Sequence, residues 1–183
     1  MGPGGVRLSA EAPIDPGTVI GHVHLKVADL DRAVRFYADA FGFEVMERFG
    51  HEAAFLSAGG YHHHLGLNTW ESRGGRPPGA GTTGLYHFAI LYPTRKALAT
   101  AFRRLLRHRA PIDGAADHGV SEAIYLHDPD GNGIEIYRDR PRQEWPRGPD
   151  GRLAMTGTPL DLKELLSLAE DEADGEGNEG STP

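Results

Sequence analysis

The chain has 183 residues, 39% of them hydrophobic, and a formal net charge of −7, which favours one globular domain or two small pseudo-repeated halves that share a core. The net negative charge and the lack of a Lys/Arg-rich stripe argue against non-specific nucleic-acid binding. The sequence has no cysteine, so disulfides, zinc-thiolate sites and cysteine nucleophiles are excluded.

The N-terminal segment, residues 1–17, reads "MGPGGVRLSAEAPIDPG" and is predicted to be flexible. It lacks an apolar core of signal-peptide length, and no stretch of the chain approaches the roughly 18 apolar residues of a membrane span. We therefore expect a cytoplasmic protein with no membrane partner.

Residues 18–70 are predicted to form a first βαβββ module. "TVIGHVHLKV" alternates apolar and polar residues with the period of a half-buried strand. The apolar spacing in "ADLDRAVRFYADAFGF" is typical of an amphipathic helix, with Asp29 as its N-cap and Gly42 just past its end. Three short strands are then predicted, near 43–49, 53–58 and 61–68.

A Gly/Pro-rich linker, residues 71–84, precedes a second module at 85–140 with the same order. It consists of a strand at 85–92, a helix beginning at Pro93, and strands near 112–117, 121–127 and 133–138, the last two joined by the turn "DPDGNG". His22 and His87, 65 positions apart, hold the same place in the two modules. The fold predicted is α+β, with two paired βαβββ modules that form one curved mixed-sheet cup. The alternative is two unrelated α+β halves.

The C-terminal part divides into an extension at 141–168 and a tail at 169–183. "TPLDLKELL" at 158–166 reads as a short capped helix. Six acidic side chains lie between Glu170 and Glu179 with almost nothing apolar among them, so the tail is predicted to be disordered.

Strand alternation predicts which side chains face the cup. In each strand the apolar set covers the helix, so the other set faces the opposite side. Tyr86, Phe88 and Ile90 are assigned to the helix side, and His63 is predicted to point away from the cup. The side chains assigned to the cup are those of His22, His24, His62, His64, Gly66, Asn68, His87, Ala89, Glu135 and Tyr137; Tyr125 and His127 share a face, but alternation in their strand is less clear.

Several imidazoles and one carboxylate in an otherwise apolar cup favour a metal site. Unpaired burial of each polar group costs about a few kcal/mol, and a divalent cation removes that cost. Two histidines and one carboxylate with vacant positions form the facial triad of non-haem Fe(II) sites. A single strand histidine, by contrast, is most often a hydrogen-bonded or surface residue.

The motifs "GHVHLKVADLDRAVRFYADAFGF", "GLYHFAI" and "YLHDPDGNGIEIY" resemble the vicinal oxygen chelate superfamily, which includes glyoxalase I, fosfomycin-resistance proteins and type I extradiol dioxygenases. The resemblance covers about residues 18–168 and is greatest to the catechol-2,3-dioxygenase-related branch. It implies a metal held by His22, His87 and Glu135. Superposing the final strands of the modules sets Gly66 opposite Glu135, where glyoxalase I carries a fourth ligand, so this departure counts against a glyoxalase.

The same resemblance implies the acid/base residues. A histidine from the fourth strand assists catalysis in extradiol dioxygenases, and alternation favours His64 for this role, with His62 behind it. The motif "H-x-hydrophobic-small-hydrophobic" would instead select His63. His118 and Tyr125 match two assisting positions. The alternative is that His118 is a structural loop histidine and Tyr125 a core tyrosine.

The function predicted is a metal-dependent extradiol ring-cleaving dioxygenase with a small aromatic substrate, O₂ and a divalent metal, Fe(II) first and Mn(II), Zn(II) or Ni(II) as alternatives. Other chemistry in the same cup is the second hypothesis, either a fosfomycin-type thiol transferase or an isomerase or epimerase. A drug- or metabolite-binding resistance protein is the third. The resemblance also implies a homodimer, and the sequence leaves open whether the cup forms within one chain or between two.

Overall fold

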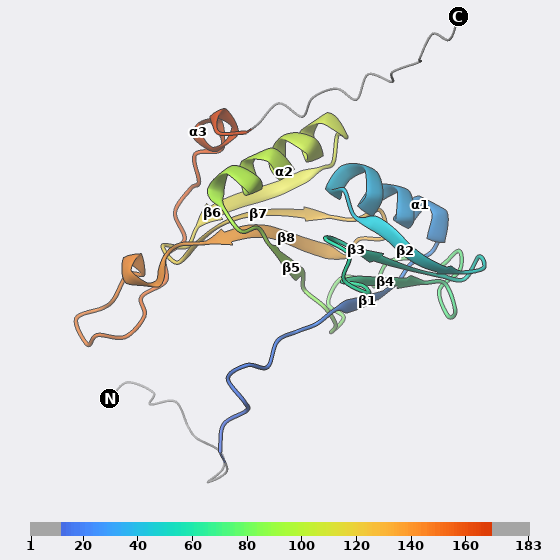
Figure 1. Cartoon of the computed structure of the whole chain (residues 1–183), viewed down its shortest axis with the longest axis horizontal. Helices are drawn as coiled ribbons and strands as arrows, with labels where there is room; N and C mark the ends of the chain where they lie inside the picture. Colours follow the sequence, from blue (N-terminus) through green and yellow to red (C-terminus); the bar gives the residue numbers. More distant parts are fainter. Residues whose placement is uncertain (1–11, 170–183) are drawn as a thin grey trace, which may run out of the picture.

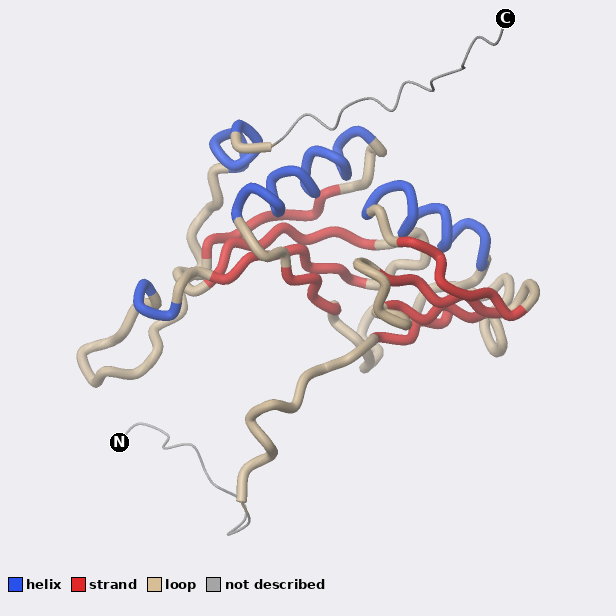
Figure 2. The backbone as a smooth tube through the Cα atoms, in the orientation of Figure 1, coloured by secondary structure: helices blue, strands red, loops and turns tan. Residues whose placement is uncertain are grey.

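The computed structural model describes residues 12–169, and the acidic tail and most of the N-terminal segment lie outside them. The fold is α+β, as predicted. Each half contributes a four-stranded mixed sheet and a helix, and both helices cover the same side of the paired sheets (Figures 1 and 2).

The two modules share one topology. The first has strand order β1-β4-β3-β2 and the second β5-β8-β7-β6, with β1 parallel to β4 and β5 parallel to β8. The elements of the first module are β1 (Val23–Lys26), α1 (Leu30–Arg35), the π-helix η1 (Phe36–Phe41), β2 (Glu44–Phe49), β3 (Ala53–Ser57) and β4 (Leu65–Asn68). Those that follow are β5 (Phe88–Leu91), α2 (Arg95–Arg107), β6 (Ile112–Asp117), β7 (Ser121–His127), β8 (Gly133–Asp139), the 3₁₀ turn η2 (Arg142–Glu144) and α3 (Leu162–Ser167).

The helix ends follow the local sequence signals. Asp29 caps α1 by accepting a hydrogen bond from the Arg32 amide, and Gly42 ends η1 in the left-handed conformation, as the sequence predicts. The second helix begins at Arg95, two positions later than predicted, because Thr94 supplies the N-cap oxygen, which accepts from the Ala97 amide.

Strand register supports a duplication. Val23 pairs with Leu65 in the first module and Phe88 with Ile134 in the second, so the registers coincide when His22 is superposed on His87. The outer hairpins also carry bulges at corresponding places, between Val45 and Glu47 and between Ile112 and Gly114. Gly66 is therefore the counterpart of Glu135, as the superposition of final strands predicted.

One hydrophobic core lies between the helices and the sheets and includes residues of both modules. Leu25, Ile134 and Ile136 are buried in it, as alternation predicted. The prediction for Tyr86 is wrong, because this side chain is 89% exposed. β5 begins only at Phe88, so Tyr86 lies in the preceding loop, where strand alternation does not apply.

The turn "DPDGNG", between β7 and β8 of the second module, forms hydrogen bonds with the first module. The Asp128 carboxylate accepts hydrogen bonds from the Asp130 and Asn132 amides and from the buried Tyr37 hydroxyl of η1, the last at 2.9 Å. Asp130 Oδ1 accepts from the Ala28 amide and from the Arg32 guanidinium. This turn therefore sets how the second module sits against the first. Burial and the neighbouring Asp128 raise the pKa of Tyr37 well above its ordinary value, so the hydroxyl stays a donor.

None of the helices between residues 12 and 169 has the length and apolar character needed to cross a membrane.

Candidate metal centre and surrounding residues

The second module brings a histidine and a carboxylate into direct contact. His87 lies one residue before β5, and Glu135 lies on β8 opposite Ala89. His87 Nε2 is 3.0 Å from Glu135 Oε2, and the Glu135 side chain is only 14% exposed. Two ligands at right angles on one ion, each about 2.1 Å from it, lie about 3 Å apart. The pair thus has the spacing of two adjacent metal ligands.

Tyr125 and His118 extend this pair. Tyr125 is paired with Glu135 across β7 and β8, and its hydroxyl is 2.7 Å from His118 Nε2. Burial, followed by the charge of Glu135, raises the pKa of Tyr125 above its ordinary value. The phenol therefore keeps its proton at neutral pH. The structure brings together four predicted site residues from this module.

The first module contributes a cluster of imidazoles. The rings of His22 and His63 have centroids 4.5 Å apart, and His63 packs edge-on against Phe55 at 5.0 Å. The prediction that His63 points away from the cup is therefore wrong. The chain from Tyr61 to His64 is not part of β4, so strict alternation does not hold before Leu65. The motif "H-x-hydrophobic-small-hydrophobic" was the signal that identified His63.

His62 and His64 have different surroundings. His62 Nδ1 is 2.8 Å from His63 Nδ1. These two nitrogens form a hydrogen bond only when one of them carries a proton and the other does not. His64 Nδ1 accepts a hydrogen bond from the Ala58 amide at 3.3 Å and lies 3.1 Å from Ser57 Oγ. Burial and the neighbouring histidines, His22 first, lower the pKa of His63. The lowered pKa favours the neutral form of the His63 imidazole.

His24 occupies the space above Gly66. The two residues are paired in register, and a Cβ at Gly66 would lie 2.8 Å from the His24 ring. His24 Nε2 is 3.0 Å from Asn68 Nδ2, and burial, with a smaller contribution from His22, lowers the pKa of His24. Glycine at the position matching Glu135 therefore makes room for an imidazole and supplies no ligand.

We expect Gly66→Ala to destabilise the protein by about 0.5–1.5 kcal/mol, the net value of one neutral hydrogen bond, because the His24 ring must leave Asn68. Gly114→Ala is the matched control, since Gly114 also lies on a strand and a Cβ there meets nothing within 4 Å. Urea denaturation of both variants measures the difference. Equal stabilities would contradict the packing of His24 on Gly66.

Aromatic side chains border the imidazole cluster. The His24 ring lies 5.8 Å from Phe55 and 5.6 Å from Trp70, and Phe49 packs edge-on against Phe55. Trp70 and Phe49 are 59% and 61% exposed. These rings form an open aromatic wall that suits a flat, apolar ligand. Alternation did not identify this wall, because Trp70 follows the end of β4.

The predicted ligands are not all together. Among residues 12–169, no group of three or more His, Asp or Glu side chains is arranged to hold a metal ion. His87 and Glu135 meet, whereas the His22 ring packs on His63. Two of the three side chains thus fit a metal ion, and the full ligand set of His22, His87 and Glu135 stays a prediction.

Comparison with known proteins identifies the relationship. Residues 19–136 match the family model described as the glyoxalase/bleomycin resistance protein/dioxygenase superfamily. The chain is 45% identical over 159 residues to a catechol-2,3-dioxygenase of Bacillus subtilis, which covers 87% of this chain and 55% of the relative. The chain thus spans about half the length of that relative.

Two further matches are weaker. A probable lactoylglutathione lyase of Vibrio parahaemolyticus is 25% identical over 128 residues, covering 65% of this chain and 89% of the relative. The crystal structure of a glyoxalase/dioxygenase from Nostoc punctiforme has a TM-score of 0.58 at 21% identity and covers 73% of this chain and all of that chain. The structural match shows the fold alone.

Proposed function

The chain belongs to the glyoxalase/bleomycin resistance protein/dioxygenase superfamily, and on that premise we propose that it is a metal-dependent extradiol dioxygenase that cleaves the ring of a catechol-like aromatic with O₂. The observation that carries this proposal is the contact between His87 and Glu135, with Tyr125 beside Glu135 on the neighbouring strand. The 45% identity to a catechol-2,3-dioxygenase supports the same activity.

We propose that His22 joins the His87–Glu135 pair to hold a divalent ion, Fe(II) first and Mn(II) second. This donor set, two neutral nitrogens and one carboxylate, is the one that suits non-haem Fe(II). When bound, the ion would supply the positive charge that favours a catecholate and the electron chemistry that O₂ requires.

Other residues of the chain would bind the aromatic ring, accept a proton and donate a hydrogen bond. The open wall of Phe55, His24 and Trp70 would receive the aromatic ring by edge and face contacts. His63, neutral and beside His22, would take a phenolic proton from the substrate. Tyr125 keeps a proton at its Oη and would donate a hydrogen bond to oxygen atoms that gain negative charge during ring opening.

Oxygen uptake with a panel of catechols tests the function. We expect O₂ consumption together with a yellow ring-cleavage product, and loss of both after treatment with a chelator. Turnover of a thiol–aldehyde adduct without O₂ consumption would overturn the proposal in favour of a lyase like the Vibrio relative. The absence of a ligating atom at Gly66 argues against that outcome.

His63→Gln is expected to lower kcat by about 100-fold or more, because general acid–base catalysis contributes about 10²–10⁴-fold. His64→Gln is the matched control in the same segment, and we expect a far smaller effect because the His64 Nδ1 is already bonded to Ala58. Steady-state kinetics with metal content measured in parallel decide between them. A larger loss in His64→Gln would return the role to His64.

A further inference from the structure

The segment after β8 pairs with the end of the edge strand β6. Thr158 and Asp117 exchange two backbone hydrogen bonds, at 2.8 and 3.0 Å, and the Thr156 amide donates to the His118 carbonyl at 3.0 Å. Because β6 lies at the edge of its sheet, this segment covers backbone groups that would otherwise face solvent. The pairing brings residues 156–158 directly beside His118.

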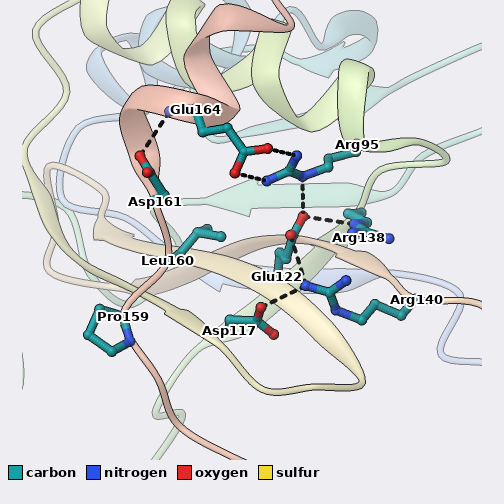
Figure 3. A pocket seen from close by; sticks show the side chains of 9 residues that line it. All are labelled: Arg95, Asp117, Glu122, Arg138, Arg140, Pro159, Leu160, Asp161 and Glu164. Atoms are coloured by element: carbon teal, nitrogen blue, oxygen red, sulfur yellow. Dashed lines mark hydrogen bonds and ion pairs between the residues drawn. The ribbon is translucent and has the colours of Figure 1, made fainter. Parts of the chain in front are cut away.

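A network of charged side chains anchors this segment (Figure 3). Arg95 of α2 bonds both Glu164 of α3, at 2.8 Å, and the buried Glu122 of β7, at 2.9 Å. Arg140 bonds Glu122 at 3.0 Å and Asp117 at 2.6 Å. The hollow of about 390 Å³ that these residues line is bordered by charges already paired with one another. The network therefore reads as an anchor for the C-terminal segment.

The anchored segment fixes the state of a site residue. His118 Nδ1 is 2.9 Å from the Thr156 carbonyl oxygen. A carbonyl only accepts, so Nδ1 carries the proton, and in the neutral ring Nε2 presents its lone pair. That nitrogen is the one 2.7 Å from the Tyr125 hydroxyl.

We propose that Thr156 is a positioning residue, whose main-chain carbonyl holds His118 in the Nδ1-protonated form so that its Nε2 accepts from Tyr125. Tyr125 is thereby held in a fixed orientation beside Glu135. The inference rests on the proposed function for its catalytic meaning, whereas the protonation state of His118 is a property of the resting protein.

Gly119 offers a way to displace the segment. It has a φ of +72°, and a Cβ there would lie 2.9 Å from Pro146 Cγ and 3.1 Å from Thr156 Oγ1. Gly119→Ala therefore adds both backbone strain and a clash with the C-terminal segment. Gly151, with a φ of +75° and nothing within 4 Å of a Cβ, makes Gly151→Ala the matched control for strain without the clash.

The experiment is a long-range proton–nitrogen NMR correlation on nitrogen-labelled, metal-free, full-length protein at about pH 8.5, where an ordinary histidine is neutral. His118→Gln assigns the signal. We expect a wild-type His118 with protonated Nδ1 and bare Nε2, unchanged in Gly151→Ala and averaged between the two tautomers in Gly119→Ala. A wild-type His118 ring in any other state overturns the proposal, and this result does not depend on whether Gly119→Ala folds. A His118 ring that keeps the wild-type state in Gly119→Ala also overturns it.

Kinetics separate this inference from the proposed function. On a catechol that the wild-type protein cleaves, Gly119→Ala is expected to lower kcat by about 10-fold or more with little change in KM, since a misplaced Tyr125 loses part of the contribution of about 10²–10³-fold that one such hydrogen-bond donor makes. An unchanged kcat overturns the catalytic role of the positioning. If no catechol is cleaved, the proposed function fails, and the NMR result still decides the state of His118.

Discussion

Glu135→Gln is expected to lower bound metal and catechol cleavage together, by more than about 100-fold. Losing a residue that only hydrogen-bonds to a metal ligand lowers metal affinity or activity by about 10- to 100-fold, and loss of a ligand itself should exceed that. Glutamine keeps the size of the side chain and its ability to contact His87, so the variant removes the negative charge and little else. Elemental analysis after dialysis measures the metal, and an oxygen electrode measures turnover.

The control for this variant is Glu144→Gln, which makes the same change at an exposed position in η2. It is expected to keep wild-type metal content and activity. Thermal denaturation should show both variants folded, because Glu135 is not part of the hydrophobic core. Full metal content in Glu135→Gln would remove Glu135 from the ligand set and with it the metal centre proposed.

Asp128→Ala is expected to destabilise the protein by about 3–5 kcal/mol, because it leaves several buried and partly buried donors without an acceptor. The donors are the Tyr37 hydroxyl, the amides of Asp130 and Asn132, and the Asn132 side chain. Asp128 is only 5% exposed, so water cannot replace the lost carboxylate without opening the contact between modules. Chemical denaturation monitored by circular dichroism measures the loss.

A double-mutant cycle sharpens this test. Tyr37→Phe alone is expected to cost about 1.5–3 kcal/mol, the value of a hydrogen bond to a charged group. In the Asp128→Ala background the same change should cost little or even stabilise, because it removes an orphaned hydroxyl. Asp150→Ala is the control, since Asp150 accepts a similar turn bond from the Arg152 amide in an exposed loop. Additive effects of the two core variants would show that Tyr37 and Asp128 act independently.

Local signals in the sequence predicted the repeat and much of the secondary structure. Asp29 and Gly42 bound the first helix because capping depends on a few adjacent residues. The correspondence of Gly66 in the first module to Glu135 in the second followed from superposing two equivalent strands, and the observed register agrees with it. Alternation failed for His63 and Tyr86, because both lie just outside a strand, where the backbone is free to turn a side chain to either face.

The sequence by itself determined that two βαβββ units exist, that a helix covers each, and that His22, His87 and Glu135 hold corresponding or register-defined places. These are consequences of periodicity and of residues close in the chain. Only the tertiary structure decided that the Thr156 carbonyl meets His118, that Tyr37 reaches Asp128, and that His63 packs on His22. Such contacts join segments whose separation carries no periodic signal, and they form because buried polar groups must find partners wherever the packed core brings them together.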